Sequence, residues 1–150
     1  MVVREAKTKS LTRALLEKKK RAIEKMLSGP PNVAAVIPIH TLSEMNMRQH
    51  YGTKSVRTKS HRNTVRICVG MQLLKFRHTP RPTSDLMVIL LERHSPRMLD
   101  GDNLNGALKA VRDGTADALG LKDDRERDDL DWECAQEQSK SHEVVVSIWF

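Results

Sequence analysis

Apolar residues are spaced in two ways along this chain, at helical intervals in some segments and in short runs in others. Helical spacing predicts helices over residues 10–27, 53–74 and 102–119. The short runs predict strands over residues 33–39, 85–93, 132–138 and 143–150, the last two forming a hairpin. Together these elements predict an α+β fold, in which a small mixed sheet packs with two or three helices.

Strong helix-breaking residues follow the first helix. Ser10 is expected to cap its start, and the Gly-Pro-Pro sequence that begins at Gly29 ends it. This break divides the chain into a basic N-terminal helix or extension over residues 1–28 and a domain over residues 29–150. Within that domain, Pro38 favours an edge position for the first strand, because proline cannot donate a ladder hydrogen bond.

Residues 53–74 carry a mixed pattern. Val65, Ile67 and Val69 alternate as they would in a strand, but a longer stripe recurs at helical spacing and favours a helix. That stripe consists of Thr58, His61, Val65, Val69, Gln72 and Leu73.

The most regular helical pattern lies in residues 102–119. At about 100° per residue, one apolar stripe faces the core. It consists of Leu104, Ala107, Leu108, Val111, Thr115, Ala118 and Leu119. The opposite face carries Asp102, Gly106, Lys109, Asp113 and Asp117. Gly120 suits the left-handed residue that closes such a helix.

Composition narrows the class of protein. The chain has 150 residues, of which 39% are hydrophobic and 30% charged, and its apolar runs are too short to cross a bilayer. The first residues include no apolar stretch of signal-peptide length, and Cys68 and Cys134 form no CxxC pair. We therefore expect a cytoplasmic protein with no membrane partner, no disulfide framework, no zinc cluster and no organic cofactor.

The charge is distributed unevenly. Residues 1–84 contain 18 Lys and Arg against 4 Asp and Glu, whereas residues 85–150 contain 8 against 15. Such a basic half indicates a polyanionic partner such as DNA, although a merely solubilising surface explains the bias equally well. The candidate DNA-binding residues are Arg48, Lys54, Arg57, Lys59, Arg62, Arg66, Lys75 and Arg77.

Acidic residues flank the third helix at both ends. Asp100 and Asp102 are two residues apart, and in an extended segment their carboxylates project to one side and repel each other unless a cation or proton lies between them. Asp123 and Asp124 follow the helix C-terminus, where the helix dipole disfavours anions. A hard divalent cation such as Mg²⁺ would relieve both penalties.

The segment LDGDNLNGALKAVRDGTADALGLKDD, which begins at Leu99, resembles the core motif of the RusA-type Holliday junction endonucleases, particularly their phage and prophage branch. That family has DxDN at the start of a helix, then a lysine, then DAL and a DD pair. Weaker similarities are a strand before Thr41-Leu42-Ser43, a basic helix, and a strand with Trp132 and Gln136. The resemblance covers approximately residues 33–150.

The resemblance implies a RusA-like homodimer that binds four-way DNA junctions and cuts two opposed strands with Mg²⁺, for which Mn²⁺ is the expected substitute. By position, it assigns metal binding to Asp100, Asp102 and Asp124 and places Lys109 near the scissile phosphate; these four residues form the expected catalytic set. Asp117 and Asp123 are further candidate ligands, although packing or capping at the helix end explains Asp117 as well. The family's lysine comes about one helical turn earlier, where this chain has Gly106, and the DD pair is displaced to match; a small insertion at the helix start would explain both.

Two other functions remain open. In the first, the chain is a non-catalytic DNA-binding protein whose acidic C-terminal half docks a protein partner. The polar face of the third helix is then solvated, and Lys109 with Asp113 is an ordinary i,i+4 pair. In the second, the chain is another Mg²⁺-dependent phosphoryl-transfer enzyme, but it has no Gly-rich phosphate-binding loop.

Overall fold

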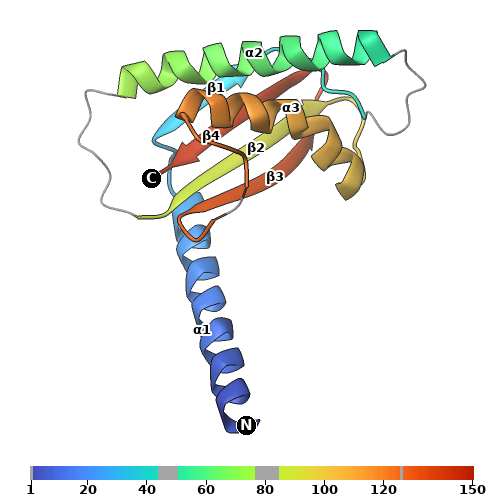
Figure 1. Cartoon of the computed structure of the whole chain (residues 1–150). Coiled ribbons are helices and arrows are strands. Elements are labelled where there is room, and N and C mark those ends of the chain that lie inside the picture. Colours follow the sequence, from blue (N-terminus) through green and yellow to red (C-terminus); the bar gives the residue numbers. More distant parts are fainter. Residues whose placement is uncertain (1, 44–50, 77–84, 126) are drawn as a thin grey trace. The chain divides into compact units, whose positions relative to one another are not determined.

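The computed structural model describes residues 2–43, 51–76, 85–125 and 127–150. The chain forms two compact units, Met1–Pro31 and Asn32–Phe150. The fold is a mixed α+β fold with three helices and one four-stranded sheet among the described residues (Figure 1).

The first unit consists of one long helix, α1 (Val2–Leu27). The expectation that this helix begins at Ser10 is wrong, because α1 runs through Ser10 without a break. The segment ahead of Ser10 contains several good helix formers, so a cap there is not required. The expected end is confirmed: α1 stops two residues before Gly29, where the Gly-Pro-Pro sequence begins.

The second unit has the element order β1 (Val33–Ile37), α2 (Tyr51–Phe76), β2 (Met87–Ser95), α3 (Gly101–Leu119), β3 (Leu130–Gln138) and β4 (Glu143–Trp149). Its sheet has the strand order β1-β4-β2-β3, in which β2 and β3 are parallel and the other neighbours antiparallel. β1 is an edge strand that ends just before Pro38, as expected. Residues 53–74 are helical, as the longer stripe predicted.

The predicted hairpin between the last two strands is wrong. β3 and β4 lie on opposite sides of β2, so they do not pair with each other. β2, α3 and β3 form a parallel strand-helix-strand unit, after which residues 139–142 cross the end of β2. A short polar connection between two strands normally indicates a hairpin, and nothing in the local sequence signals that β2 lies between them.

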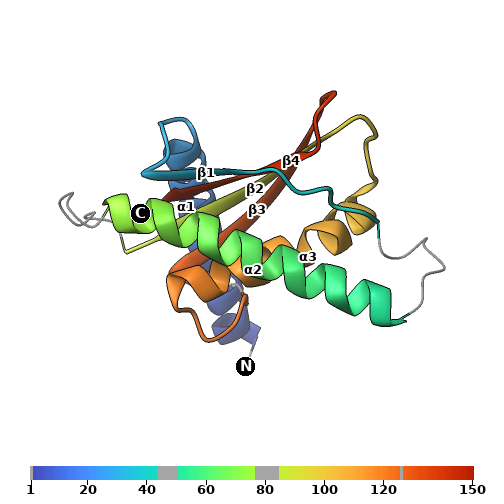
Figure 2. The ribbon, with the colours of Figure 1, turned by 90° about the horizontal axis from the view of Figure 1, so that it is seen from above.

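Helices α2 and α3 lie side by side over one face of the sheet (Figures 1 and 2). Alternate residues of the strands, such as Ile89 and Leu91 of β2, are fully buried beneath the helices. Val65 and Val69 of α2 and the predicted apolar stripe of α3 complete this core. The opposite face of α3 is thereby left accessible, and it carries two of the four candidate catalytic residues, Asp102 and Lys109.

Candidate functional site

Two hydrogen-bonded contacts fix the start of α3. The backbone of Leu99 is held by the Gln136 side chain of β3, whose Oε1 accepts from Leu99 N at 2.9 Å and whose Nε2 donates to Leu99 O at 2.6 Å. Ser43 Oγ donates to Asn103 Oδ1 at 2.5 Å. Both partners belong to segments far from α3 in the sequence. Their contacts give a structural role to the Gln136 and Ser43 positions that accompany the DxDN motif.

Asp100 and Asp102 occupy this helix start. Asp100 is the N-cap residue, and its Oδ1 accepts a hydrogen bond from Asn103 N at 3.0 Å. Asp102 lies in the first turn. Exposed N–H groups and the helix dipole stabilise negative charge at this end of a helix, which offsets the mutual repulsion of the two carboxylates. The proximity of these residues therefore does not by itself require a cation.

Lys109 lies on the same exposed face of α3, between two aspartates. Its Nζ is 2.7 Å from Asp113 Oδ1 and 2.6 Å from Asp124 Oδ2. Burial lowers the pKa of Lys109, but the hydrogen bonds to both aspartates outweigh it and the net shift is upward. The ammonium group is therefore protonated throughout the neutral pH range.

Asp124 is neutralised by side chains of α3. Its carboxylate binds Lys109 and also lies 3.3 Å from Arg112 Nε. The Arg112 guanidinium donates to the backbone carbonyl of Asp124 and stacks over Trp132 of β3. The hydrogen bond from Lys109, with the charges of Lys109 and Arg112, lowers the pKa of Asp124. Two cations of the protein thus provide the compensation that the sequence argument assigned to a metal ion.

Asp117 forms a two-pronged ion pair with Arg62 of α2. The Nε–Oδ2 distance is 2.6 Å and the Nη2–Oδ1 distance is 2.8 Å. The Arg62 hydrogen bond lowers the pKa of Asp117, and the same bond raises the pKa of Arg62. Asp117 therefore ties α3 to α2, a role that is neither of the two considered from sequence. Asp123, the other additional candidate, accepts a hydrogen bond from the backbone of Arg125.

The expected convergence of Asp100, Asp102 and Asp124 on one ion is not observed. Their oxygens do not lie within 4.8 Å of one another, a separation that only Glu92, His94 and Glu137 satisfy as a trio of possible ligands in the described part of the chain. Asp100 and Asp102 alone still offer the number of carboxylates that Mg²⁺ takes, which is one or two together with water and phosphate oxygens. A site made of all three aspartates does not fit this arrangement.

Glu92, His94 and Glu137 belong to a different region. Glu92 and His94 alternate with the buried residues of β2, so they lie on the sheet face away from α2 and α3. Glu137 of β3 and Glu143 of β4 stand directly opposite His94 in the sheet. His94 Nε2 lies 2.5 Å from Glu92 and Nδ1 lies 3.3 Å from Glu143. Both ring nitrogens thus face carboxylates, which favours the imidazolium form.

This cluster predicts a pH-dependent contribution to stability. The hydrogen bond to Glu92 raises the pKa of His94 despite partial burial, and the charges of Glu137 and Glu143 add to the effect. Since the pKa is higher in the folded state, the stabilisation is complete below about pH 6.5, the value for an unperturbed histidine, and is lost as the pH rises through the folded value. We expect the difference in unfolding free energy between the wild type and His94→Gln to shrink from pH 6 to pH 9, as measured by urea denaturation. A difference that grows over this range would contradict the assignment.

The basic surface is formed by α2. Six of the candidate DNA-binding residues lie on this helix: Lys54, Arg57, Lys59, Arg62, Arg66 and Lys75. Arg48 and Arg77 lie outside the described residues. α2 contains no acidic residue, so its exposed side presents positive charge alone. Lys59 and Arg66 are seven residues apart and share one face.

A groove joins this basic helix to the face of α3. The cavity has a volume of about 280 Å³, and Lys54 and His61 of α2 and Gly106 and Lys109 of α3 contribute to its lining. Positive side chains from two helices therefore border one hollow, two turns along α3 from Asp102. This arrangement can hold a phosphate chain beside the acidic start of α3.

Sequence reasoning missed one charged residue of β2. Arg93 is 3% exposed and falls on the same side of the strand as Ile89 and Leu91. A charged residue in phase with the apolar residues of a strand is the signal that could have identified it.

The chain matches no known protein family and no curated protein. None of the described helices combines the length and the apolar character needed to span a membrane.

Proposed function

We propose that this protein is a Mg²⁺-dependent, structure-selective DNA endonuclease of the RusA type, acting as a homodimer on four-way junctions. The observation that carries the proposal is the exposed face of α3, where Asp100 and Asp102 lie at the helix start and Lys109 lies further along, beside the basic helix α2. Acidic ligands, a fixed cation and a basic surface are the components that phosphodiester hydrolysis requires.

Asp100 and Asp102 are the residues that would hold the ion. An ion bound there would supply an activated water and neutralise charge on the phosphate. Asp113 and Asp124 hold the Lys109 ammonium group in place and keep it charged. Lys109 can then stabilise negative charge on a phosphate oxygen in the groove. In this proposal Asp124 acts through Lys109 and is not a ligand of the same ion.

The cations of α2 provide the attraction for DNA, because the acidic start of α3 would repel it. Aromatic residues make up only 3% of the chain, which argues against recognition of single strands by base stacking. Recognition of duplex arms through their backbone fits the surface better. Two opposed cuts in a four-way junction require two active sites related by symmetry, which is the reason for proposing a homodimer.

The test uses labelled four-way junctions, linear duplexes and single strands, each with Mg²⁺, with Mn²⁺ or with a chelator. We expect paired, metal-dependent cuts in the junction and little cutting of the other substrates. Tight binding to the four-way junction, without cutting in the presence of any divalent metal, would instead support the non-catalytic alternative. One observation favours that alternative: Asp113, Asp117 and Asp124 are already paired with Lys and Arg side chains.

The basic surface can be tested separately by salt dependence. Arg66→Gln removes one exposed charge from α2, and we expect binding to weaken and the slope of log K against log salt to fall by about 0.9, the value for one lost phosphate contact. Arg127→Gln removes the same charge next to β3, at the opposite end of β2 from the start of α3, and should leave the slope unchanged. If neither variant changes the slope of log K against log salt, the DNA surface lies away from α2.

A further inference from the structure

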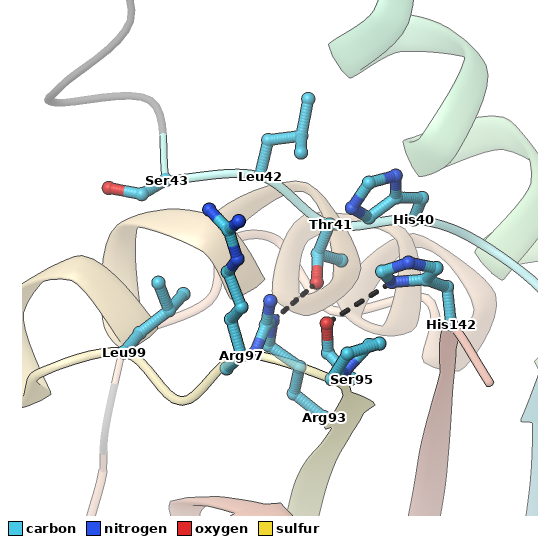
Figure 3. Close-up of a pocket in the computed structure, with 10 residues that line it drawn as sticks. His40, Thr41, Leu42, Ser43, Arg93, Ser95, Arg97, Leu99 and His142 are labelled. Carbon is cyan, nitrogen blue, oxygen red and sulfur yellow. Dashed lines mark hydrogen bonds between the residues drawn. The ribbon is translucent and has the colours of Figure 1, made fainter. Parts of the chain in front are cut away.

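A second pocket adjoins the groove, and Leu42 lines both. Its volume is about 350 Å³, and it is formed by the segment after β1, the end of β2 and the connection between β3 and β4. Its polar lining includes His40, Thr41, Arg93, Ser95, Arg97 and His142, and no acidic residue among the described residues lines it (Figure 3). Leu42, Pro96 and Leu99 complete the lining, so positive and hydrogen-bonding groups stand among a few apolar side chains.

Arg93 is the buried charge of this pocket. Its Nε donates to Thr41 Oγ1 at 3.0 Å and its Nη1 donates to the backbone carbonyl of Arg97 at 2.7 Å. Both acceptors are neutral, and within the described ranges no carboxylate forms an ion pair with Arg93. Burial accordingly lowers the pKa of Arg93. A buried guanidinium that lacks a counter-anion is costly, so a bound anion would be strongly stabilised.

Arg97 and several hydrogen-bonding groups surround Arg93 in this pocket. The Arg93 and Arg97 side chains both point toward the segment that carries Thr41 and Leu42 (Figure 3). The rings of His40 and His142 are in contact, with centroids 3.7 Å apart and an angle of 34° between the ring planes. Burial, followed by the neighbouring charges of His142 and Arg93, lowers the pKa of His40. Ser95 Oγ lies 3.1 Å from His142 Nδ1, so hydroxyl and imidazole groups are held at the same wall.

The pocket adjoins the proposed catalytic residues through two of its own lining residues. Leu99 lines the pocket and immediately precedes Asp100. Ser43 lines it too, and donates to Asn103 in the first turn of α3. The lining of this pocket therefore extends to the residue next to Asp100, one of the two proposed metal ligands.

We propose that this pocket binds a phosphate group, and that in the proposed nuclease it holds a DNA phosphate next to the one that is cut. Arginine, histidine and hydroxyl side chains form the donor set that recognises phosphate oxygens. The placement of the bound strand rests on the proposed function, whereas the binding of phosphate itself does not. Arg93 is the buried arginine of the site, and Arg97 is the exposed one.

The experiment titrates the full chain with inorganic phosphate, thymidine 5′-monophosphate and the dinucleoside phosphate TpT, at constant ionic strength maintained with chloride and without divalent metal. NMR signals of the histidine rings report the pocket. We expect the His40 and His142 signals to move in a saturable manner. Stronger binding of the monophosphate indicates a strand end as the natural ligand, and stronger binding of TpT an internal phosphate. Absence of any saturable change at these two rings with all three probes overturns the proposal.

Arg97→Gln is the informative variant, because Arg93→Gln removes a buried group and could unfold the chain. Arg97 contributes its backbone carbonyl to Arg93, which the substitution preserves. Loss of one charge-assisted hydrogen bond should weaken phosphate binding about tenfold, whereas Arg127→Gln should bind as the wild type does. Equal phosphate affinities of the wild type, Arg97→Gln and Arg127→Gln would overturn the proposed phosphate site.

The two proposals fail separately. If phosphate shifts the His40 and His142 signals but the protein does not cut junctions, the phosphate-binding proposal stands and the nuclease proposal is rejected. If the protein cuts junctions, Arg97→Gln does not affect the cutting, and the histidine signals do not respond to phosphate, the nuclease proposal stands and the phosphate-binding proposal is rejected.

Discussion

Replacing Asp102 with asparagine is expected to reduce cutting of four-way junctions by at least about 10²-fold while leaving junction binding intact or tighter. Asparagine keeps the size of the side chain at the start of α3 but removes the negative charge that would hold Mg²⁺. Binding does not suffer, because the removed charge repels the DNA phosphates. The measurement is a pair of assays on one labelled junction: single-turnover cutting with Mg²⁺, and gel-shift binding with Ca²⁺ or chelator.

Asp129→Asn is the matched control, since it removes one exposed carboxylate beside β3, far along the chain from the α3 start, and should cut as the wild type does. Asp124→Asn separates two arrangements of the site. If Asp124 acts through Lys109, its loss lowers the cutting rate but leaves the affinity for Mn²⁺, measured by electron paramagnetic resonance, unchanged. Asp102→Asn should lower that affinity. Normal cutting by Asp102→Asn would remove this residue from the catalytic site.

The elements of the fold could be predicted where one face of an element is buried. The apolar stripe of α3 and its closure at Gly120, which has a φ of 68°, follow directly from helical periodicity. Pro38 correctly indicated an edge strand. The hairpin error has a different origin, because the pairing of β3 and β4 depends on where β2 lies and not on the connection between them.

The candidate site could be predicted only as far as the faces of α3. Helical spacing placed Asp102, Lys109, Asp113 and Asp117 on one accessible side. It does not tell how close that side comes to residues outside the helix, such as Asp124. Folding brings Asp124 against Lys109 and Arg112, and brings Arg62 of α2 against Asp117. The charge compensation that the sequence argument assigned to a metal is therefore provided in part by lysine and arginine, whose positions only the tertiary structure determines.

Arg93 illustrates the opposite situation. Its position on the buried side of the strand was predictable, since it follows Leu91 by two residues. The continuous run of apolar residues before it hides the alternation of buried and exposed positions. The pocket around it combines three separate connections of the chain, and no single segment carries a recognisable phosphate-binding motif.

Gly114→Ala is expected to destabilise the protein, because α2 comes so close to α3 at this position that an added methyl group has no room. A Cβ at Gly114 would lie 2.4 Å from the backbone carbonyl oxygen of Arg62 and 2.9 Å from Val65 Cβ. Neither neighbour can turn aside as the end of a flexible side chain could, so the helices must separate. Overpacking of this kind costs about 1–3 kcal/mol, and it outweighs the gain of about 0.5–1 kcal/mol that alanine brings to a helix interior.

Gly106→Ala provides the control within the same helix, since a Cβ there meets nothing within 4 Å. It should stabilise the protein by about 0.5–1 kcal/mol through helix propensity alone. Urea denaturation of both variants measures the two effects with opposite signs. Separation of the helices would also loosen the Arg62–Asp117 ion pair and widen the groove beside Lys109, so Gly114→Ala should weaken junction binding. Equal stabilities of the two variants would mean that α2 and α3 do not pack through Gly114, and the groove proposed to hold DNA would lose its structural basis.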